Sequence, residues 1–138
     1  MTSMPAALRS GLLLVVITIL VAACSSGGSS SSRPEAPATV TDGAVTVTAD
    51  DLEFDATSIE ATAEEAFTIT LVNNDSAPHN ISIYTEEGGE RIVEGTVING
   101  GETTEIEVPA LEAGTYFFVC DVHTDMNGPL VVSGASSS

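Results

Sequence analysis

Short segments in which apolar and polar residues alternate run through the middle of this 138-residue chain. A two-residue period turns one face of a segment to the core and the other to solvent, so it predicts half-buried β-strands. The alternation is clearest in segments 45–48, 52–55, 67–71, 81–83 and 104–108. Two more apolar segments, 115–119 and 129–132, predict further strands.

Turn-forming residues separate the predicted strands. They cluster at 73–76, 87–89, 99–101, 112–114 and 127–128, which are rich in Asn, Asp and Gly. No segment has a convincing amphipathic helical pattern, and no internal repeat is present. The pattern therefore predicts an all-β fold of about seven or eight short strands, a Greek-key β-sandwich or barrel, that spans residues 44–133.

The N-terminal segment differs from this pattern. Residues 12–23 are apolar except for Thr18 and follow a single basic residue, Arg9. This pattern is typical of an export signal, and the segment is too short to span a bilayer comfortably. The last residues before Cys24, Val-Ala-Ala, resemble the bacterial lipobox, where cleavage makes the Cys N-terminal and lipid is attached to it. The alternative is an ordinary signal peptide with a chance Cys. We expect a lipoprotein signal peptide at 1–23 and lipidation of Cys24.

Two polar segments flank the predicted domain. Residues 24–43 are rich in Ser, Gly and Pro and indicate a disordered tether after the lipid anchor. Residues 134–138 resemble them and indicate a disordered tail. The protein is thus expected to be exported and held by lipid at the outer face of the cell membrane or in the periplasm.

The composition is strongly acidic. The chain has 20 Asp and Glu residues, three Arg and no Lys, with a formal net charge of −17. Such a surface repels nucleic acid and attracts cationic proteins. A dispersed acidic surface also keeps a protein soluble, and one this acidic is compatible with adaptation to high salt, where screening weakens steering.

Side chains that bind soft metals are concentrated late in the chain. With the signal removed and Cys24 lipidated, Cys120, His79, His123 and Met126 are the only Cys, His and Met residues left. A buried thiol and a core Met would explain Cys120 and Met126 without any metal. However, one thiolate, two imidazoles and a thioether are also the ligand set of a mononuclear blue-copper site.

Two motifs carry a resemblance to a known family. Residues 76–80 (SAPHN) and 114–128 (GTYFFVCDVHTDMNG) are similar to the cupredoxins, the group of plastocyanin, pseudoazurin and amicyanin. The short Cys-x2-His-x2-Met loop resembles amicyanin most. The similarity extends from 48–54 to the predicted strand 129–132, nearly the whole domain.

The resemblance implies a role for each motif residue. Cys120 would supply the thiolate, His79 and His123 one ring nitrogen each, and Met126 the weak axial sulfur for one copper ion. Asn80 would donate its backbone N–H to the Cys sulfur and brace the ligand loop with its side chain. The chain departs from many relatives at Val119, Val122 and Asp121, and an unscreened Asp121 carboxylate would favour Cu(II).

These implications point to a monomeric one-electron carrier that cycles Cu(II)/Cu(I) and has no enzymatic activity. Its partner would be a redox protein such as a cytochrome or an oxidase with a basic docking face, and His123, with Pro129 nearby, would form the electron port. Two alternatives stay open: a copper storage or delivery lipoprotein without redox cycling, and a metal-free adhesion module. Segment 85–96 has no clear counterpart in short cupredoxins, and its role stays open.

Overall fold

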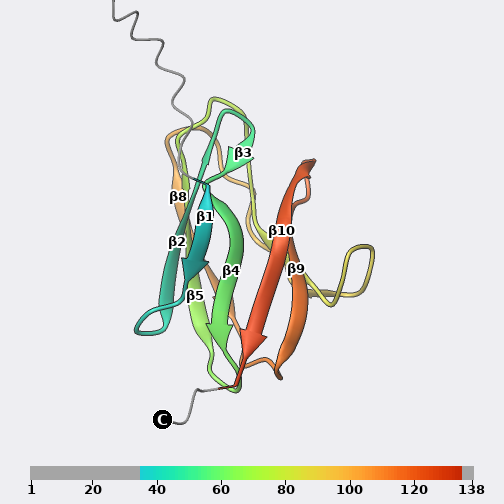
Figure 1. Ribbon diagram of the computed structural model, residues 1–138. Coiled ribbons are helices and arrows are strands. Elements are labelled where there is room, and N and C mark those ends of the chain that lie inside the picture. Colours follow the sequence, from blue (N-terminus) through green and yellow to red (C-terminus); the bar gives the residue numbers. More distant parts are fainter. Residues whose placement is uncertain (1–34, 135–138) are drawn as a thin grey trace, which may run out of the picture. The chain divides into compact units, whose positions relative to one another are not determined.

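The computed structural model describes residues 35–134, and in this part of the chain ten β-strands form two packed sheets (Figure 1). The strands are β1 (Ala36–Thr39), β2 (Ala44–Asp50), β3 (Glu53–Phe54), β4 (Ala56–Thr62), β5 (Phe67–Asn73), β6 (Ser82–Tyr84), β7 (Arg91–Val93), β8 (Thr103–Val108), β9 (Gly114–Cys120) and β10 (His123–Ser133). The predicted all-β sandwich is confirmed. The described residues contain no helix long and apolar enough to cross a bilayer.

The larger sheet has six strands in the order β1-β4-β10-β9-β6-β7. β4 runs parallel to both β1 and β10, whereas β9 runs antiparallel to β10 and β6. The strands β1, β4 and β10 therefore begin at one end of the sandwich, where β9 ends (Figure 1). We call this the β9–β10 end, because it contains the turn between Cys120 and His123.

The smaller sheet has four strands in the order β3-β2-β5-β8. Its inward positions alternate with half-buried or exposed residues, as in β5, where every second residue from Phe67 is buried and those between are half-buried. The inward residues of both sheets form one hydrophobic core. Burial of such aliphatic side chains contributes about 1.5–3 kcal/mol each and is the main source of stability.

The folded region begins earlier than the sequence predicts. Residues 36–43 fall in the predicted tether, yet Ala36–Thr39 form β1, and Thr41 pairs with Ala44 to close a turn into β2. The Ser-rich tract ends at Ser32, and the parallel partner β4 supplies the hydrogen bonds that a short strand needs. The predicted signal peptide 1–23, Cys24 and residues 135–138 of the predicted tail lie outside the described residues.

Two other predictions differ from the structure. Residues 35–134 contain ten strands, more than the seven or eight predicted. The predicted segments do not include β1, β4 and β7, and β4 alternates only weakly in its sequence ATSIEAT. Asn127 and Gly128 lie inside β10 and do not form the predicted turn. A Cβ atom at Gly128 would lie 2.8 Å from the Phe118 ring, so this glycine allows close packing of strands.

Candidate metal centre

The hairpin of β9 and β10 places two of the expected ligands. Cys120 is the last residue of β9 and pairs across the antiparallel strands with His123, the first residue of β10. Side chains alternate along β9, so Cys120 points to the core side together with Phe118, and both are fully buried. His123 is half-buried at the β9–β10 end.

His79 approaches from the loop that follows β5. Its backbone N–H donates to the Ile98 carbonyl oxygen at 3.0 Å, and its own carbonyl oxygen accepts from the Ile98 N–H at 2.9 Å. The side-chain amide of Asn73 donates to the carbonyl oxygens of Ala77 and Ile98. This bonding fixes the loop although it is irregular, and the His79 side chain is completely buried.

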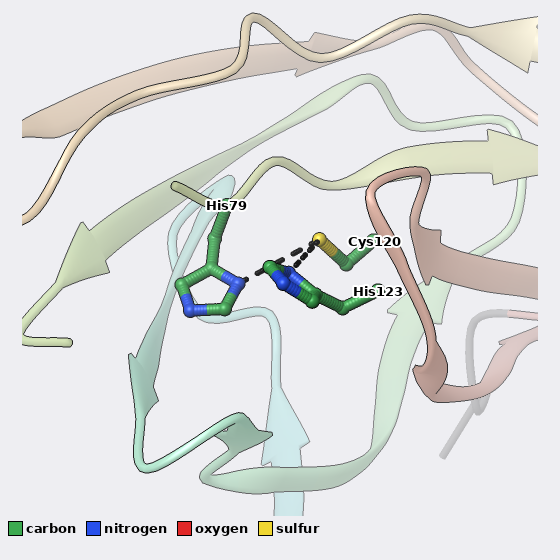
Figure 2. Close-up of side chains that lie close together, drawn as sticks. All are labelled: His79, Cys120 and His123. Carbon is green, nitrogen blue, oxygen red and sulfur yellow. Dashed lines mark hydrogen bonds between the residues drawn. The ribbon is translucent and has the colours of Figure 1, made fainter. Parts of the chain in front are cut away.

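The three donor groups converge (Figure 2). The Sγ atom of Cys120 lies 3.7 Å from Nδ1 of His79 and 3.9 Å from Nδ1 of His123. The ligand atoms of the three residues all lie within 4.8 Å of one another. Donors that bind one ion at about 2.0–2.3 Å in a trigonal or tetrahedral arrangement are about 3.3–4.0 Å apart. The donor set and its spacing therefore fit a single soft metal ion.

Asp75 holds the far side of the His79 ring. Its Oδ2 atom lies 3.1 Å from His79 Nε2 and also accepts the backbone N–H of Leu52 at 2.8 Å. The Leu52 N–H, then the His79 ring and the Ala77 N–H, hold the pKa of Asp75 well below its usual range. An ionised carboxylate at Nε2 retains the proton there, which leaves the Nδ1 lone pair directed at Cys120.

The local sequence around Asp75 indicates only a turn. It lies in the Asn-rich cluster 73–76, which resembles many turns without a role at a site. The four-residue spacing from Asp75 to His79 does not by itself indicate a contact. The other partner of Asp75, Leu52, comes from a different loop and cannot be identified from the local sequence. The contact is a consequence of tertiary structure.

Asn80 joins the His79 segment to the residue after Cys120. Its Oδ1 atom accepts the backbone N–H of Asp121 at 2.8 Å, and its Nδ2 donates to the Asp121 carboxylate at 2.7 Å and to the Gly95 carbonyl at 3.0 Å. Asn80 is buried, so these bonds are not exposed to competing water. The backbone N–H bond from Asn80 to the Cys sulfur, implied by the resemblance, stays a prediction.

The Asp121 carboxylate is surrounded by donors. Besides Asn80, it accepts hydrogen bonds from the hydroxyl groups of Ser82 and Tyr84. Partial burial opposes its ionisation, but the hydrogen bonds from Ser82, Asn80 and Tyr84 outweigh this effect and lower the pKa of Asp121. The negative charge beside Cys120 is therefore hydrogen-bonded on several sides and not free.

Segment 85–96 takes part in this network. Its first part, between β6 and β7, is an exposed loop, but its last residues return to the site. Gly95 donates its N–H to the Ser82 hydroxyl and accepts from Asn80. A Cβ atom at Gly95 would collide with the Ile81 carbonyl oxygen, so only glycine permits this approach.

Met126 is buried in β10, three residues beyond His123. The pairing of β10 with β9 is irregular between His123 and Asn127, so this stretch departs from a regular strand. Met126 also lines a cavity of about 260 Å³ with Leu52, Phe54 and Asp125 among others. Its position in β10 close to His123 is compatible with a role for its thioether sulfur as a fourth donor. That role stays a prediction.

Apolar side chains surround the exposed edge of the cluster. The most exposed large apolar residues of the described chain are Leu52 at 51% and Val97 and Val122 at 47% each. Leu52 bonds to Asp75, Val97 precedes Ile98, and Val122 lies between Cys120 and His123. All three thus lie at the β9–β10 end, where His123 is the half-buried member of the cluster; Pro129 lies farther along β10, opposite Phe117.

The chain is similar in sequence to a known domain family and to two amicyanins. The cupredoxin-like domain model matches residues 12–132. Amicyanin-alpha of Methylorubrum extorquens is 31% identical over 98 residues, which cover 71% of this chain and 76% of the relative. Amicyanin of Paracoccus denitrificans is 28% identical over 99 residues, 72% of each chain.

Solved structures agree with this match. A variant of amicyanin in its Cu(I) form has a TM-score of 0.51 and 28% identity, and the match covers 67% of this chain and 85% of that one. Reduced auracyanin from Roseiflexus castenholzii has a TM-score of 0.58 and covers 67% of this chain and 98% of that one; at 21% identity it supports the fold alone. From the extent of the domain match and the identity to amicyanin-alpha, the chain belongs to the cupredoxin-like family.

Proposed function

We propose that the chain is a lipid-anchored electron carrier that holds one copper ion and has no turnover chemistry of its own. The observation that carries this proposal is the convergence of the His79 and His123 Nδ1 atoms on the Cys120 Sγ atom at one end of a rigid sandwich. The amicyanin relative described in a Cu(I) form supports copper as the cofactor. Bound copper would supply a Cu(II)/Cu(I) couple.

The protein residues would keep the site nearly unchanged between the two redox states. Cys120, His79 and His123 would hold the ion, with Met126 as a weaker fourth donor, the ligand set of a blue-copper site. The backbone bonds between His79 and Ile98 fix the His79 loop, and the Asn80–Asp121 bonds connect it to the segment that contains Cys120. Because the ligands are fixed by the fold, little rearrangement is needed at each electron transfer.

His123 is the proposed electron port. Cys120 and His79 are fully buried, whereas His123 is half-buried beside Val122. A partner that docks on this edge would approach the site through the His123 ring and exclude water against the apolar residues. The acidic surface would favour a cationic redox protein, such as a cytochrome or an oxidase.

Export and lipid attachment at Cys24 complete the proposal. They rest on the apolar segment 12–23 and the lipobox-like residues before Cys24, which lie outside the described residues. A Cys24→Ala variant should be exported poorly or released from membranes, and its copper site should be unaffected. Fractionation of cells that express both forms measures this difference.

The copper site is tested by visible absorption and electron paramagnetic resonance after Cu(II) is added to the protein. We expect an intense thiolate-to-copper band and narrow copper hyperfine splitting, both absent in Cys120→Ser. A Thr115→Ser variant, exposed at the far end of β9, is the control and should keep the spectrum. A colourless wild-type protein would contradict the proposal.

Redox cycling separates an electron carrier from a copper storage or delivery protein. Voltammetry of the copper-loaded protein should show a reversible one-electron wave with no loss of the ion over repeated cycles. Release of copper on reduction would favour storage or delivery instead.

A further inference from the structure

The chain enters the fold at the same end as the candidate metal centre. β1 begins at Ala36, which pairs with Ala56 at the start of β4, and β4 is parallel to β10, with which it pairs from Ile59 and Leu130 onward. In Figure 1 the beginnings of β1 and β10 lie at the same end of the sandwich. Glu35, the residue before β1, lines the cavity that also contains Met126. The N-terminal connection therefore leaves beside the ligands.

The connection to the proposed lipid anchor is short compared with the sandwich. Residues 25–35 separate Cys24 from Ala36, and as a coil they would span about 20 Å r.m.s. and about 40 Å at full extension. β10 has 11 residues, so the two ends of the sandwich are about 33 Å apart. To point the β9–β10 end away from the bilayer, the connection would have to stretch close to its limit.

This stretching is unfavourable for a flexible chain. For a coil with an r.m.s. end-to-end distance of about 20 Å, the probability density at 33 Å is roughly one-fiftieth of its value at short distances. With lipid on Cys24, a connection of this length would therefore favour orientations in which the β9–β10 end is toward the membrane. A connection as long as the predicted tether, 24–43, would impose this orientation only weakly.

The surface of the β9–β10 end combines apolar and acidic groups. Leu52, Val97 and Val122 are the exposed apolar residues at this end. Around the cavity beside Leu52 lie Glu53 and Asp125, and the whole described chain contains one Arg, Arg91, and no Lys. Such a surface is repelled by anionic lipid headgroups, so the bilayer itself is a poor partner.

We propose that the β9–β10 end docks on a membrane-embedded redox protein whose exposed face combines apolar residues with a cationic rim, and that the entry of β1 at this end sets the orientation. The inference deepens the proposed function and rests on its lipid anchor and its electron port. In the redox step one electron leaves the reduced chain, which is oxidised, and enters a one-electron acceptor of the partner, which is reduced.

Orientation is tested on the full lipidated chain in phosphatidylcholine vesicles that carry nitroxide-labelled headgroups. A fluorophore is attached at Glu53→Cys in β3 or at Glu112→Cys, which precedes β9 at the opposite end. Both positions are exposed, whereas Cys120 is buried and protected. Vesicles without nitroxide provide the reference intensity for each label, so quenching by other groups cancels.

We expect several-fold stronger nitroxide quenching at residue 53 than at residue 112, and a smaller difference when the connection is doubled in length with Gly and Ser. Equal quenching, or stronger quenching at residue 112, would overturn the proposed orientation. The measurement is valid with or without copper. Flotation with vesicles measures lipid anchoring, and the visible band measures copper binding. Failure of the proposed function can therefore be distinguished from failure of the proposed orientation.

Docking is tested by matched substitutions of exposed valines, Val97→Asp at the β9–β10 end and Val131→Asp on β10 opposite Thr115. The reduced, copper-loaded chain is mixed with washed native membranes, and its reoxidation is followed by the return of the visible band. We expect Val97→Asp to slow reoxidation at least tenfold and Val131→Asp to leave it unchanged. Reoxidation by ferricyanide should be equal in both variants, which shows that the site is intact.

Two results would contradict a membrane-embedded partner. One is equal reoxidation of wild type and Val97→Asp by washed membranes. The other is reoxidation by the soluble fraction alone, with none by membranes, which would assign the partner to a soluble protein. A decrease of the membrane rate as salt rises is expected from a cationic rim.

Discussion

The Asp75 carboxylate connects its own loop, which also contains His79, to Leu52, 23 residues earlier in the sequence. It accepts from the Leu52 backbone, from the Ala77 backbone and from the buried His79 ring. A carboxylate at the outer nitrogen of a metal-binding imidazole increases the basicity of the inner nitrogen and fixes the ring. Asp75 is therefore a positioning residue for His79, and its charge should favour the more highly charged Cu(II) state.

Asp75→Asn is expected to raise the reduction potential. A tenfold loss of preference for Cu(II) corresponds to about 59 mV for one electron, and loss of such an outer partner typically weakens metal binding about 10–100-fold. Voltammetry and competitive copper titration measure the two effects. Glu105→Gln, which removes one charge from the exposed face of β8, is the control and should shift the potential much less. Equal shifts would indicate a general charge effect.

Tyr84 reports the state of Asp121. The hydrogen bond to Asp121, then burial and the Asp121 charge, raise the pKa of Tyr84 above its ordinary value near 10, although Arg91 acts in the opposite direction. Because the folded-state pKa is raised, the associated stability is present below about pH 10 and is lost as pH rises through the folded-state value.

Asp121→Asn should bring the Tyr84 pKa back toward 10. The chain has two Tyr, so a Tyr116→Phe background leaves Tyr84 as the only chromophore in an ultraviolet titration of the phenolate. We expect the phenolate titration of Tyr116→Phe alone to have its midpoint at a higher pH than that of the double variant. The same midpoint in both would show that Asp121 does not influence Tyr84.

At the scale of elements, the turn between β2 and β3 departs from ordinary turn preferences. Asp51 and Leu52 both have positive φ, at 53° and 61°, a pattern that favours Asn and Gly. A bulky residue with this backbone costs roughly 1–2 kcal/mol, and the Leu52 side chain gains little from burial because it is half exposed. Leu at this position is therefore better explained by a surface contact than by stability.

Leu52→Gly should stabilise the domain and weaken docking. We expect an increase of about 1 kcal/mol in the free energy of unfolding, measured by urea denaturation of the metal-free protein, since the strain is removed. Reoxidation by washed membranes should slow in the same variant. Gly134→Ala, which has open space and no positive φ, is a neutral control. A destabilised Leu52→Gly protein would show that the side chain contributes to packing.

Elements were predicted unevenly, for physical reasons. Strands with strict alternation, such as β5 and β8, agree with the predicted segments because one face of each is buried. β1 is a short, mostly exposed edge strand that depends on its partner β4, so it has almost no signal of its own. Gly128 has the sequence context of a turn residue, and only its close packing against the Phe118 ring and the Thr57 carbonyl oxygen explains why glycine is required.

At the scale of the whole molecule, charge is the dominant feature. All 20 acidic residues lie in the described chain, with Arg91 as its single Lys or Arg. Repulsion among like charges destabilises a compact state, and salt screens it, since the Debye length falls from about 10 Å at 0.1 M to about 3 Å at 1 M.

The melting temperature should therefore rise as NaCl increases from low to molar concentration, as calorimetry can measure. A variant with Glu105→Gln and Glu107→Gln, which removes two neighbouring charges from the exposed face of β8, should depend less on salt. A melting temperature independent of salt would show that the acidic residues are too dispersed to repel one another.

The sequence by itself determined the all-β class, the acidic surface and the four candidate ligands. Alternation, composition and the small number of soft donors are properties of the sequence itself and need no knowledge of long-range contacts. Tertiary structure decided what depends on long-range contacts: the convergence of His79 on Cys120, the bonds of Asp75 and Asp121, and the entry of β1 beside the site. These features join residues from separate loops and strands, so they exist only once the sheets have packed.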